Sequence, residues 1–174
     1  MYLAKNAKKE VKIHTPYIIC NDYMYNELKN IKVPTTIMTN SAENNGNIFG
    51  AVDYLNHKKD IINTGVTIKE YEGGISYHGK SMTIDDDIAI VGSFNMDMRS
   101  AYIDTELMLV INSKDINKQL KASMEEYEKK AATVKNETEY SHIPEGMKMK
   151  ELSDKKKNIK AWFGWAMNGL RFLF

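Results

Sequence analysis

The stretch SYHGKSMTIDDDIAIVGSFNMDMRSAYIDTE, residues 76–106, places two apolar runs on either side of an acidic turn at residues 85–87. This pattern predicts a β-hairpin. His78 and Lys80 are two residues apart, so on an extended strand their side chains share one face. The polar segment 92–95 follows the second apolar run. The sequence therefore predicts a hairpin that gathers imidazole, ammonium, hydroxyl and carboxamide groups at one end.

These residue types suit an anionic, phosphate-like group. Lys80 supplies positive charge, Ser93 and Asn95 supply neutral hydrogen bonds, and His78 is able to attack or to transfer protons. Consecutive acidic side chains on a turn point apart, so residues 85–87 are interpreted as a solvated turn and not as a metal site. We expect neither a metal nor a cofactor.

The signature H-x-K-x4-D-x6-G-S-x-N is filled at its full spacing by His78, Lys80, Asp85, Gly92, Ser93 and Asn95. Through it the stretch resembles the phospholipase D superfamily. The continuation at 95–100, together with Glu106, is similar to the second, C-terminal motif of bacterial cardiolipin synthases. The similarity covers about residues 5–130, and Asp104 departs from it because cardiolipin synthases usually carry Asn there.

The resemblance implies a two-step phosphodiester exchange. His78 would form a phosphohistidine, or would serve as acid and base opposite a histidine that does. Glu106 would hydrogen-bond the other ring nitrogen of His78 and fix its tautomer. Asp85 and Gly92 would be structural, with Asp85 bracing the turn. The implied catalytic residues are His78, Lys80 and Glu106, and the implied phosphate-binding residues are Lys80, Ser93 and Asn95.

Superfamily active sites use two such motifs, and this chain carries one. The resemblance therefore implies either a homodimer or a missing N-terminal half. Three functions stay open: a cardiolipin-synthase-type phosphatidyltransferase acting on a phosphatidylglycerol-like phospholipid, a homodimeric phosphodiesterase or nuclease, and a non-catalytic membrane-associated half-enzyme. The extended motif favours the first. The formal net charge of +1 argues against nucleic acid as a partner.

Apolar periodicity predicts an α/β fold, and the resemblance implies a phospholipase D-like mixed sheet flanked by helices. Strands are predicted at 11–14, 35–39, 66–71 and 107–111, and helices at 22–30, 48–63 and 114 to about 132. Asp22 and Ser113 are the predicted N-caps of the first and third helix. The run 107–111 is apolar throughout, which is typical of a buried strand.

The sequence leaves the role of Tyr17 open and gives His14 no catalytic role. In the resemblance the Thr-Pro-Tyr segment lines the site, so Tyr17 is either a substrate contact or a packed aromatic. His14 has no partner visible in the sequence and is interpreted as structural. Cys20 is the single cysteine, which excludes an intramolecular disulfide.

The sequence predicts three segments: a catalytic half-domain at 1–132, a polar linker or arm at 133–160, and an amphipathic aromatic tail helix at 161–174. Residues 146–174 hold seven Lys or Arg and two Asp or Glu, a net charge of +5. Aromatic faces beside a narrow polar stripe are typical of a helix on anionic lipid. The alternative is a helix that docks on the domain or on a partner. The preferred interpretation places the protein peripherally on a bacterial cell membrane.

Overall fold

An eight-stranded mixed sheet forms the middle layer of the computed structural model, which describes residues 1–163, 169 and 171–173. The strands run in the order β10-β9-β4-β3-β1-β5-β6-β8. Their bounds are β1 (Val11–His14), β3 (Thr35–Asn40), β4 (Thr67–Tyr71), β5 (Ser81–Ile84), β6 (Ile88–Gly92), β8 (Met108–Asn112), β9 (Ala131–Val134) and β10 (Tyr140–His142). Neighbours β1, β3 and β4 pair in parallel, and the other pairs are antiparallel.

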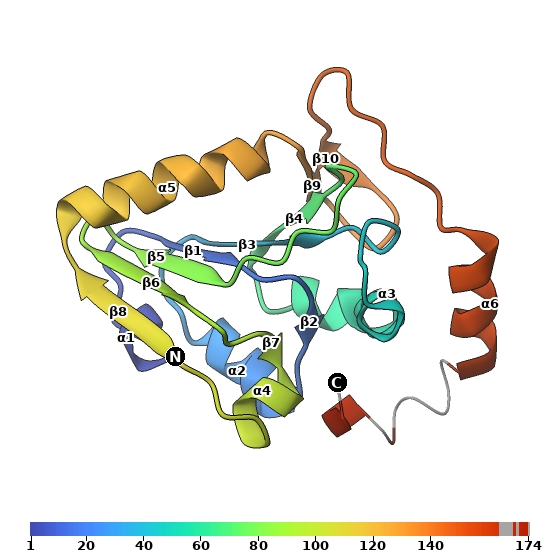
Figure 1. The fold of residues 1–174 in the computed structure, drawn as a ribbon, viewed down its shortest axis with the longest axis horizontal. Helices are drawn as coiled ribbons and strands as arrows, with labels where there is room; N and C mark the ends of the chain where they lie inside the picture. The colour runs from blue at the N-terminus through green and yellow to red at the C-terminus, as the bar shows by residue number, and fades with distance from the viewer. Residues whose placement is uncertain (164–168, 170, 174) are drawn as a thin grey trace.

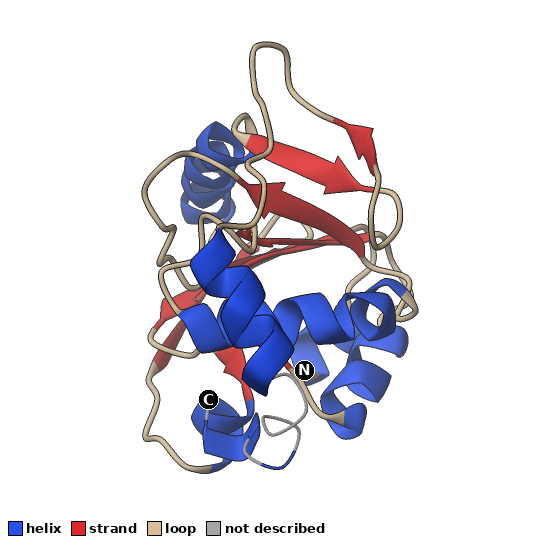
Figure 2. Ribbon diagram, turned by 90° about the vertical axis from the view of Figure 1, so that its right-hand side faces the viewer, coloured by secondary structure: helices blue, strands red, loops and turns tan. Residues whose placement is uncertain are grey.

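Helices cover both faces of this sheet. They are α1 (Tyr2–Lys5), α2 (Asp22–Lys29), α3 (Ile48–Ile62), α4 (Met98–Tyr102), α5 (Lys114–Glu128) and α6 (Asp154–Phe163), with a 3-10 turn η2 (Arg171–Leu173). In Figure 1, α5 runs along one side of the strands, and α2, α3 and α4 lie on the other. The same layering is visible from the side in Figure 2. The predicted α/β class, with a mixed sheet flanked by helices, is confirmed.

A second, two-stranded sheet joins the segment after β1 to the motif loop. In it β2 (Ile18–Ile19) pairs in parallel with β7 (Met96–Asp97). Ile18 and Ile19 are fully buried. Burial of such apolar residues stabilises the pair, so the Thr-Pro-Tyr segment lies beside the residues that follow Asn95.

Polar side chains begin the main helices. Ser113 caps α5, as predicted, by accepting from the backbone N–H of Ile116 at 3.4 Å. For α2 the prediction of Asp22 as N-cap is wrong. Asn21 has the extended backbone of a cap and accepts from Met24 N at 3.0 Å, so Asp22 is the first helical residue.

The apolar run 107–111 is not a buried strand, so that prediction is wrong. The run forms β8 at one edge of the sheet, and Leu109 is 57% exposed. An apolar run indicates only that a strand has hydrophobic side chains on both faces. It does not indicate whether another part of this chain covers those side chains.

The C-terminal region also differs from the prediction. Helix α5 ends at Glu128 instead of continuing to about residue 132, because Ala131 and Ala132 are buried in β9, which pairs with β4. Within the expected linker at 133–160 the chain forms β10 and begins α6.

The predicted tail helix at 161–174 falls partly outside the described residues, which omit 164–168, 170 and 174. Arg171, a described residue of that segment, is bound to the domain. Its guanidinium forms a two-point pair with the Asp53 carboxylate at 2.6 and 3.2 Å, and it donates to Cys20 O at 2.8 Å. In the part of the chain that the structure covers, no helix has the length and apolarity needed to cross a bilayer.

Candidate active site

His78 and Lys80 lie in direct contact. β5 begins only at Ser81, so both residues belong to an irregular segment that leads into the strand and not to the strand itself. The Lys80 ammonium donates to His78 Nδ1 at 2.9 Å and to His78 O at 3.0 Å. Burial, and then the charge of Lys80, lowers the pKa of His78 below its ordinary value. The lowered pKa favours the neutral form of the imidazole.

Glu106 is bound by two serines and not by the imidazole that the resemblance implied. Its Oε2 accepts from Ser93 Oγ, and its Oε1 accepts from Ser100 Oγ at 2.9 Å. Leu107 N donates to Ser93 Oγ at 3.0 Å, which fixes the Ser93 side chain between strand and carboxylate. Glu106 acts on Lys80 only through space, by opposing the effect of burial, which lowers the pKa of Lys80.

Asn95 holds a buried oxygen of the motif that has no partner in the described part of the chain. Its Nδ2 donates to Ser100 Oγ at 3.4 Å, while its Oδ1 is buried and has no hydrogen-bond partner among the described residues. Leaving such an atom unpaired costs about 1–3 kcal/mol. Met96 N donates to Thr15 Oγ1 at 3.2 Å, so the chain around Asn95 is tied to the Thr-Pro-Tyr segment.

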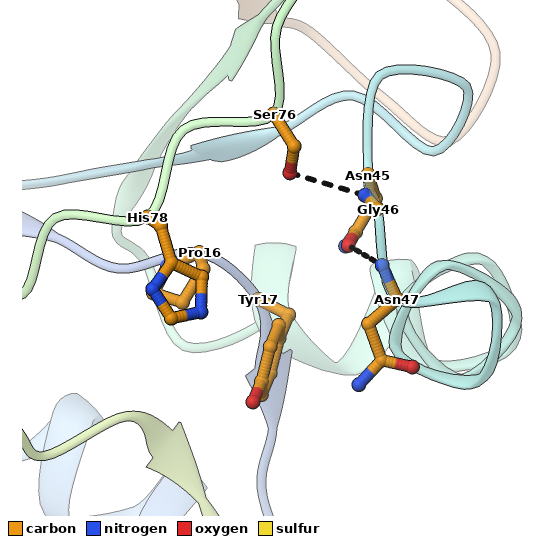
Figure 3. Close-up of a pocket in the computed structure, with 7 residues that line it drawn as sticks. All are labelled: Pro16, Tyr17, Asn45, Gly46, Asn47, Ser76 and His78. Carbon is orange, nitrogen blue, oxygen red and sulfur yellow. Dashed lines mark hydrogen bonds between the residues drawn. The ribbon is translucent and has the colours of Figure 1, made fainter.

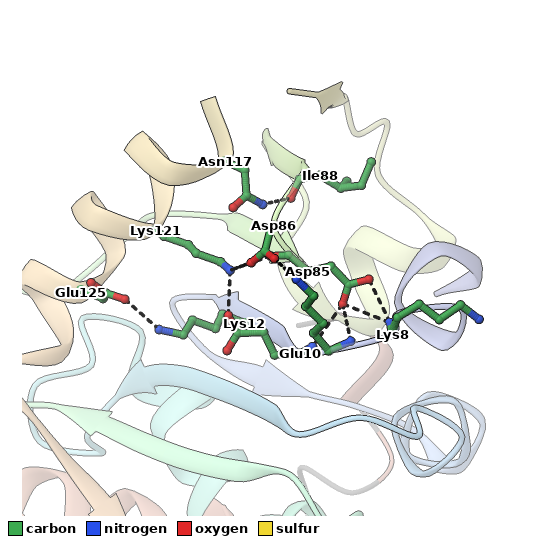
Figure 4. Close-up of polar contacts among 10 residues, drawn as sticks. Lys8, Glu10, Lys12, Asp85, Asp86, Ile88, Asn117, Lys121 and Glu125 are labelled. Carbon is green, nitrogen blue, oxygen red and sulfur yellow. Dashed lines mark hydrogen bonds and ion pairs between the residues drawn. The ribbon is translucent and has the colours of Figure 1, made fainter. Parts of the chain in front are cut away.

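The remaining motif residues hold the backbone. A Cβ on Gly92 would lie 2.1 Å from Leu107 O, so only glycine lets β8 pass beside β6 at this point. Asp85, at φ 51°, accepts three backbone N–H groups, from Lys8, Lys9 and Glu10 (Figure 4). Burial alone would raise the pKa of Asp85, but these three donors lower it below its ordinary value.

The acidic turn is exposed at Asp86, and its carboxylates also have charged partners. Asp86 pairs with Lys9 and, at 3.5 Å, with Lys121 of α5. Lys121 also donates to Asp85 O at 2.6 Å and to Glu10 at 2.7 Å, which ties α5 to the hairpin (Figure 4).

Asn40 and Tyr77, which sequence reasoning missed, fix the backbone in front of His78. The Asn40 amide accepts from Tyr77 N and donates to Tyr77 O, both at 2.8 Å. The Tyr77 ring covers Gly79 so closely that a Cβ there would lie 2.2 Å from its hydroxyl. Asn40 ends β3, 37 residues before Tyr77, so no local pattern connects them.

His14 is buried and has two partners that the sequence did not reveal. Its Nδ1 lies 3.2 Å from Tyr77 Oη and its Nε2 lies 3.2 Å from Glu128 Oε1. A carboxylate only accepts, so Nε2 carries the proton and the Tyr77 hydroxyl donates to Nδ1. The contact chain Glu128–His14–Tyr77 thus ends at the residue next to His78.

A cavity of about 340 Å³ opens beside the imidazole. Its lining residues come from three loops and are Pro16, Tyr17, Asn45, Gly46, Asn47, Ser76 and His78 (Figure 3). Tyr17, for which two interpretations were open, lines this cavity and is half-buried in it. Among residues 1–163, 169 and 171–173, no three His, Cys, Asp or Glu side chains are grouped as metal ligands.

The comparisons with known proteins agree with this arrangement. The family model described as "Cardiolipin synthase, PLD-like domain" matches residues 2–127. Cardiolipin synthase 1 of Staphylococcus epidermidis is 31% identical over 149 residues, which cover 84% of this chain and 30% of that protein. Cardiolipin synthase 1 of Staphylococcus aureus is 29% identical over 149 residues, again 84% of this chain and 29% of the relative. The chain thus spans less than a third of the length of these relatives.

Solved structures share the fold at low identity. The phosphatidylserine synthase of Haemophilus influenzae superposes with a TM-score of 0.71 at 16% identity, covering 99% of this chain and 43% of that one. Nuc of Salmonella typhimurium, a phospholipase D family member, gives 0.62 at 18% identity, covering 76% and 86%. The match of the family model over residues 2–127, which is most of the chain, shows that the chain belongs to the cardiolipin synthase family of phospholipase D-like domains.

Proposed function

We propose that this chain supplies one of the two H-x-K motifs of a cardiolipin-synthase-type phosphatidyltransferase. The observation that carries the proposal is the contact of His78, whose pKa is lowered, with Lys80, beside the Ser93–Glu106 pair and at the edge of a polar cavity. An attacking group, a cation for phosphoryl oxygens and room for an alcohol then lie side by side.

In the proposed reaction a nitrogen of His78 attacks phosphorus, and the bond from phosphorus to the leaving alcohol breaks. The alcohol oxygen takes a proton from the histidine of the second motif. A second alcohol then loses its proton to that histidine and attacks phosphorus, which breaks the bond to His78. Lys80, released from His78 Nδ1, and the amide of Asn95 hold the phosphoryl oxygens. One alcohol replaces another with no net change in phosphodiester bonds.

An exposed apolar surface beside the site supports the pairing with a second half. Large exposed apolar side chains follow α4 and β8: Tyr102, Ile103, Leu107, Leu109 and Val110. Leu109 and Val110 are neighbours on the edge strand, so they extend from its opposite faces. A groove of about 580 Å³ reaches from α1 and α2 to Phe94 and Met96, on either side of Asn95. Apolar surface of this extent marks an interaction site in soluble proteins. We infer that a second phospholipase D-like half docks there, from a second copy or from the rest of a longer enzyme.

Contact with a membrane is part of the proposal, and α6 supports it. Trp162 is 84% exposed, and Lys155, Lys157 and Lys160 are also exposed on this helix. Exposed tryptophan beside lysines suits the surface of anionic lipid. The protein would then lie peripherally on the membrane, with α6 toward the lipid and Arg171 bound to the domain.

The test combines solution mass with turnover. The chain, alone and mixed with the other half of a related synthase, is assayed on phosphatidylglycerol vesicles, and its mass is measured by light scattering. We expect His78-dependent exchange in whichever state holds two motifs. His78→Ala should lower the rate on the order of 10³-fold, whereas His142→Ala, an exposed histidine of β10, should not. Exchange that survives in His78→Ala would exclude the mechanism.

A further inference from the structure

The Glu106 carboxylate sets the direction of the hydrogen bonds around it. A carboxylate only accepts, so the hydroxyl protons of Ser93 and Ser100 both point toward Glu106. A serine hydroxyl has a single proton, and both protons are thereby used. While these bonds stand, Ser93 has no proton for a phosphoryl oxygen, and its Oγ also accepts from Leu107 N at 3.0 Å. Ser93 therefore braces Glu106 and the start of β8.

Ser100 passes this direction on to Asn95. Its Oγ lies 3.3 Å from Asn95 N and 3.4 Å from Asn95 Nδ2. Because the Ser100 proton is on the side of Glu106, Ser100 is the acceptor in both contacts. The Asn95 amide must then turn its nitrogen toward Ser100. A carboxamide nitrogen has two protons, so one remains for a ligand.

The unpaired oxygen of Asn95 fits the same direction. Oδ1 is buried and has no hydrogen-bond partner within the part of the chain that the structure describes. A rotation of the amide by half a turn would bring Oδ1 to Ser100 Oγ, which has no proton to offer it. The rotation would thus place two acceptors against each other, so it is opposed by the carboxylate beyond Ser100.

The hydroxyl of Ser100 is fixed in place by its own helix. Ser100 is 5% exposed, and its backbone N–H donates to the Asp97 carboxylate at 2.5 Å, which caps α4. Asp97 belongs to β7, which pairs with β2. The direction of the network is therefore established before any ligand binds.

We propose that Ser100 is a positioning residue: it transmits to the Asn95 amide the hydrogen-bond direction set by Glu106, so that Nδ2 and not Oδ1 meets a phosphoryl oxygen. The proposal rests on the phosphatidyltransferase function proposed above. A reversed amide would turn its oxygen toward the anionic phosphoryl oxygens and repel them. Glu106 then serves the phosphate-binding side of the site, while Lys80 occupies His78 Nδ1 at 2.9 Å.

The test follows the binding of dimethyl phosphate to the full chain by NMR, which needs no turnover. We expect this diester to shift the side-chain amide signals of Asn95. Ser100→Ala should weaken its binding about fivefold, because the amide loses the acceptor that orients it. Glu106→Gln should weaken it similarly, because a glutamine amide can donate to Ser100 and release the Ser100 proton toward Asn95 Oδ1. The tautomer of His78, read from its ring nitrogen signals, should be the same in both variants as in the wild type.

A double variant separates transmission from mere loss of contacts. If Glu106 acts through Ser100, Glu106→Gln added to Ser100→Ala should weaken dimethyl phosphate by no more than about twofold further. Ser123→Ala, at an exposed serine of α5, is the matched control and should bind like the wild type. Should Ser100→Ala not fold, the wild type still gives the answer: nuclear Overhauser contacts must place the Asn95 amide protons beside the Ser100 β protons.

Four results overturn the proposal: wild-type affinity in Ser100→Ala, additive losses in the double variant, an Asn95 amide that dimethyl phosphate does not shift, or an amide oxygen facing Ser100. A changed His78 tautomer in Glu106→Gln alone would instead assign Glu106 to the imidazole. The phosphatidyltransferase itself fails on a different result: the absence of His78-dependent exchange on vesicles when two motifs are present.

Discussion

At the scale of single residues, the position of His78 depends on side chains that perform no chemistry. The segment before β5 has no strand pairing at His78, so its backbone is fixed by the Asn40 amide and by Tyr77. Tyr77 is in turn bound to His14 and packs edge-on against Tyr127, with ring centroids 4.8 Å apart. His78 is thus supported from the interior of the domain, and this support is open to mutation.

Tyr77→Phe should lower the free energy of unfolding by about 1–3 kcal/mol, because it leaves the buried Nδ1 of His14 without a donor. Urea denaturation measures the change. Tyr127→Phe removes a hydroxyl from the neighbouring ring, which is partly exposed, and should change the stability by less than about 0.5 kcal/mol. Equal effects of the two substitutions would show that the hydroxyl of Tyr77 contributes nothing.

The pair of His14 and Glu128 predicts a loss of stability in acid. Burial alone would raise the pKa of Glu128, but hydrogen bonds from His14 and Lys69 lower it from 4.5 to about 2. A carboxyl with a lowered pKa in the folded state stabilises the fold above the unfolded value of 4.5 and loses that contribution as the pH falls toward 2. The contribution is about 3 kcal/mol at most.

His14 adds to the same trend, because burial lowers its pKa below 6.5 and the unfolded chain takes up the proton first. Stability measured by urea denaturation should therefore fall from pH 7 downward, most steeply below pH 4.5. Glu128→Gln should flatten the steep part, whereas Glu126→Gln, which removes a surface carboxylate on the same helix, should not. A slope in Glu128→Gln equal to that of the wild type would contradict the assignment.

At the scale of elements, α6 is linked to the active-site loop by one lysine. Lys156 is 8% exposed, and its ammonium satisfies three carbonyls of residues 42–45. Burial lowers the pKa of Lys156, and the nearby Glu43 carboxylate opposes this effect. A helix that faces the membrane in the proposed function is thereby tied to the loop that forms the cavity.

Lys156→Met should retain the packing of the side-chain stem but release the three carbonyls. We expect a loss of about 1–3 kcal/mol in stability and faster backbone hydrogen exchange at residues 42–47. Lys155→Met, a neighbouring exposed lysine, is the matched control and should alter neither quantity. Unchanged exchange in Lys156→Met would mean that the loop is held by its other contacts alone.

At the scale of the whole molecule, the two edges of the sheet differ. One edge strand is β10, which is short, and the other is β8, which has exposed apolar side chains. Leu107, the residue before β8, is 79% exposed. An exposed edge strand with apolar side chains is a template for association. In the proposed function, the position of this edge, next to Glu106 and Asn95, would connect association with completion of the active site.

Leu109→Lys should therefore weaken the association with a second half at least tenfold, measured by light scattering or sedimentation over a concentration series. Ile143 lies just after β10, at the opposite edge of the sheet, and is an apolar side chain of comparable exposure. The control substitution Ile143→Lys should therefore leave association unchanged. If both variants associate like the wild type, the apolar surface of β8 is not the docking face.

The sequence by itself determined the α/β class, the cap of α5 and the identity of the motif residues. Apolar periodicity and capping depend on neighbours within a few positions, so a local pattern is enough to recognise them. The spacing of His78, Lys80, Ser93 and Asn95 is likewise a property of one continuous stretch.

The tertiary structure alone decided which groups support and surround that motif. Asn40 and Tyr77 are 37 residues apart, His14 and Glu128 are 114 apart, and Lys156 meets a loop more than 100 residues away. Periodicity carries no information on such pairs, because side chains meet only after the sheet has set the order of its strands. For the same reason the run 107–111 identified a strand but not its exposed edge position, and Glu106 was found on Ser93 and Ser100 instead of on the imidazole.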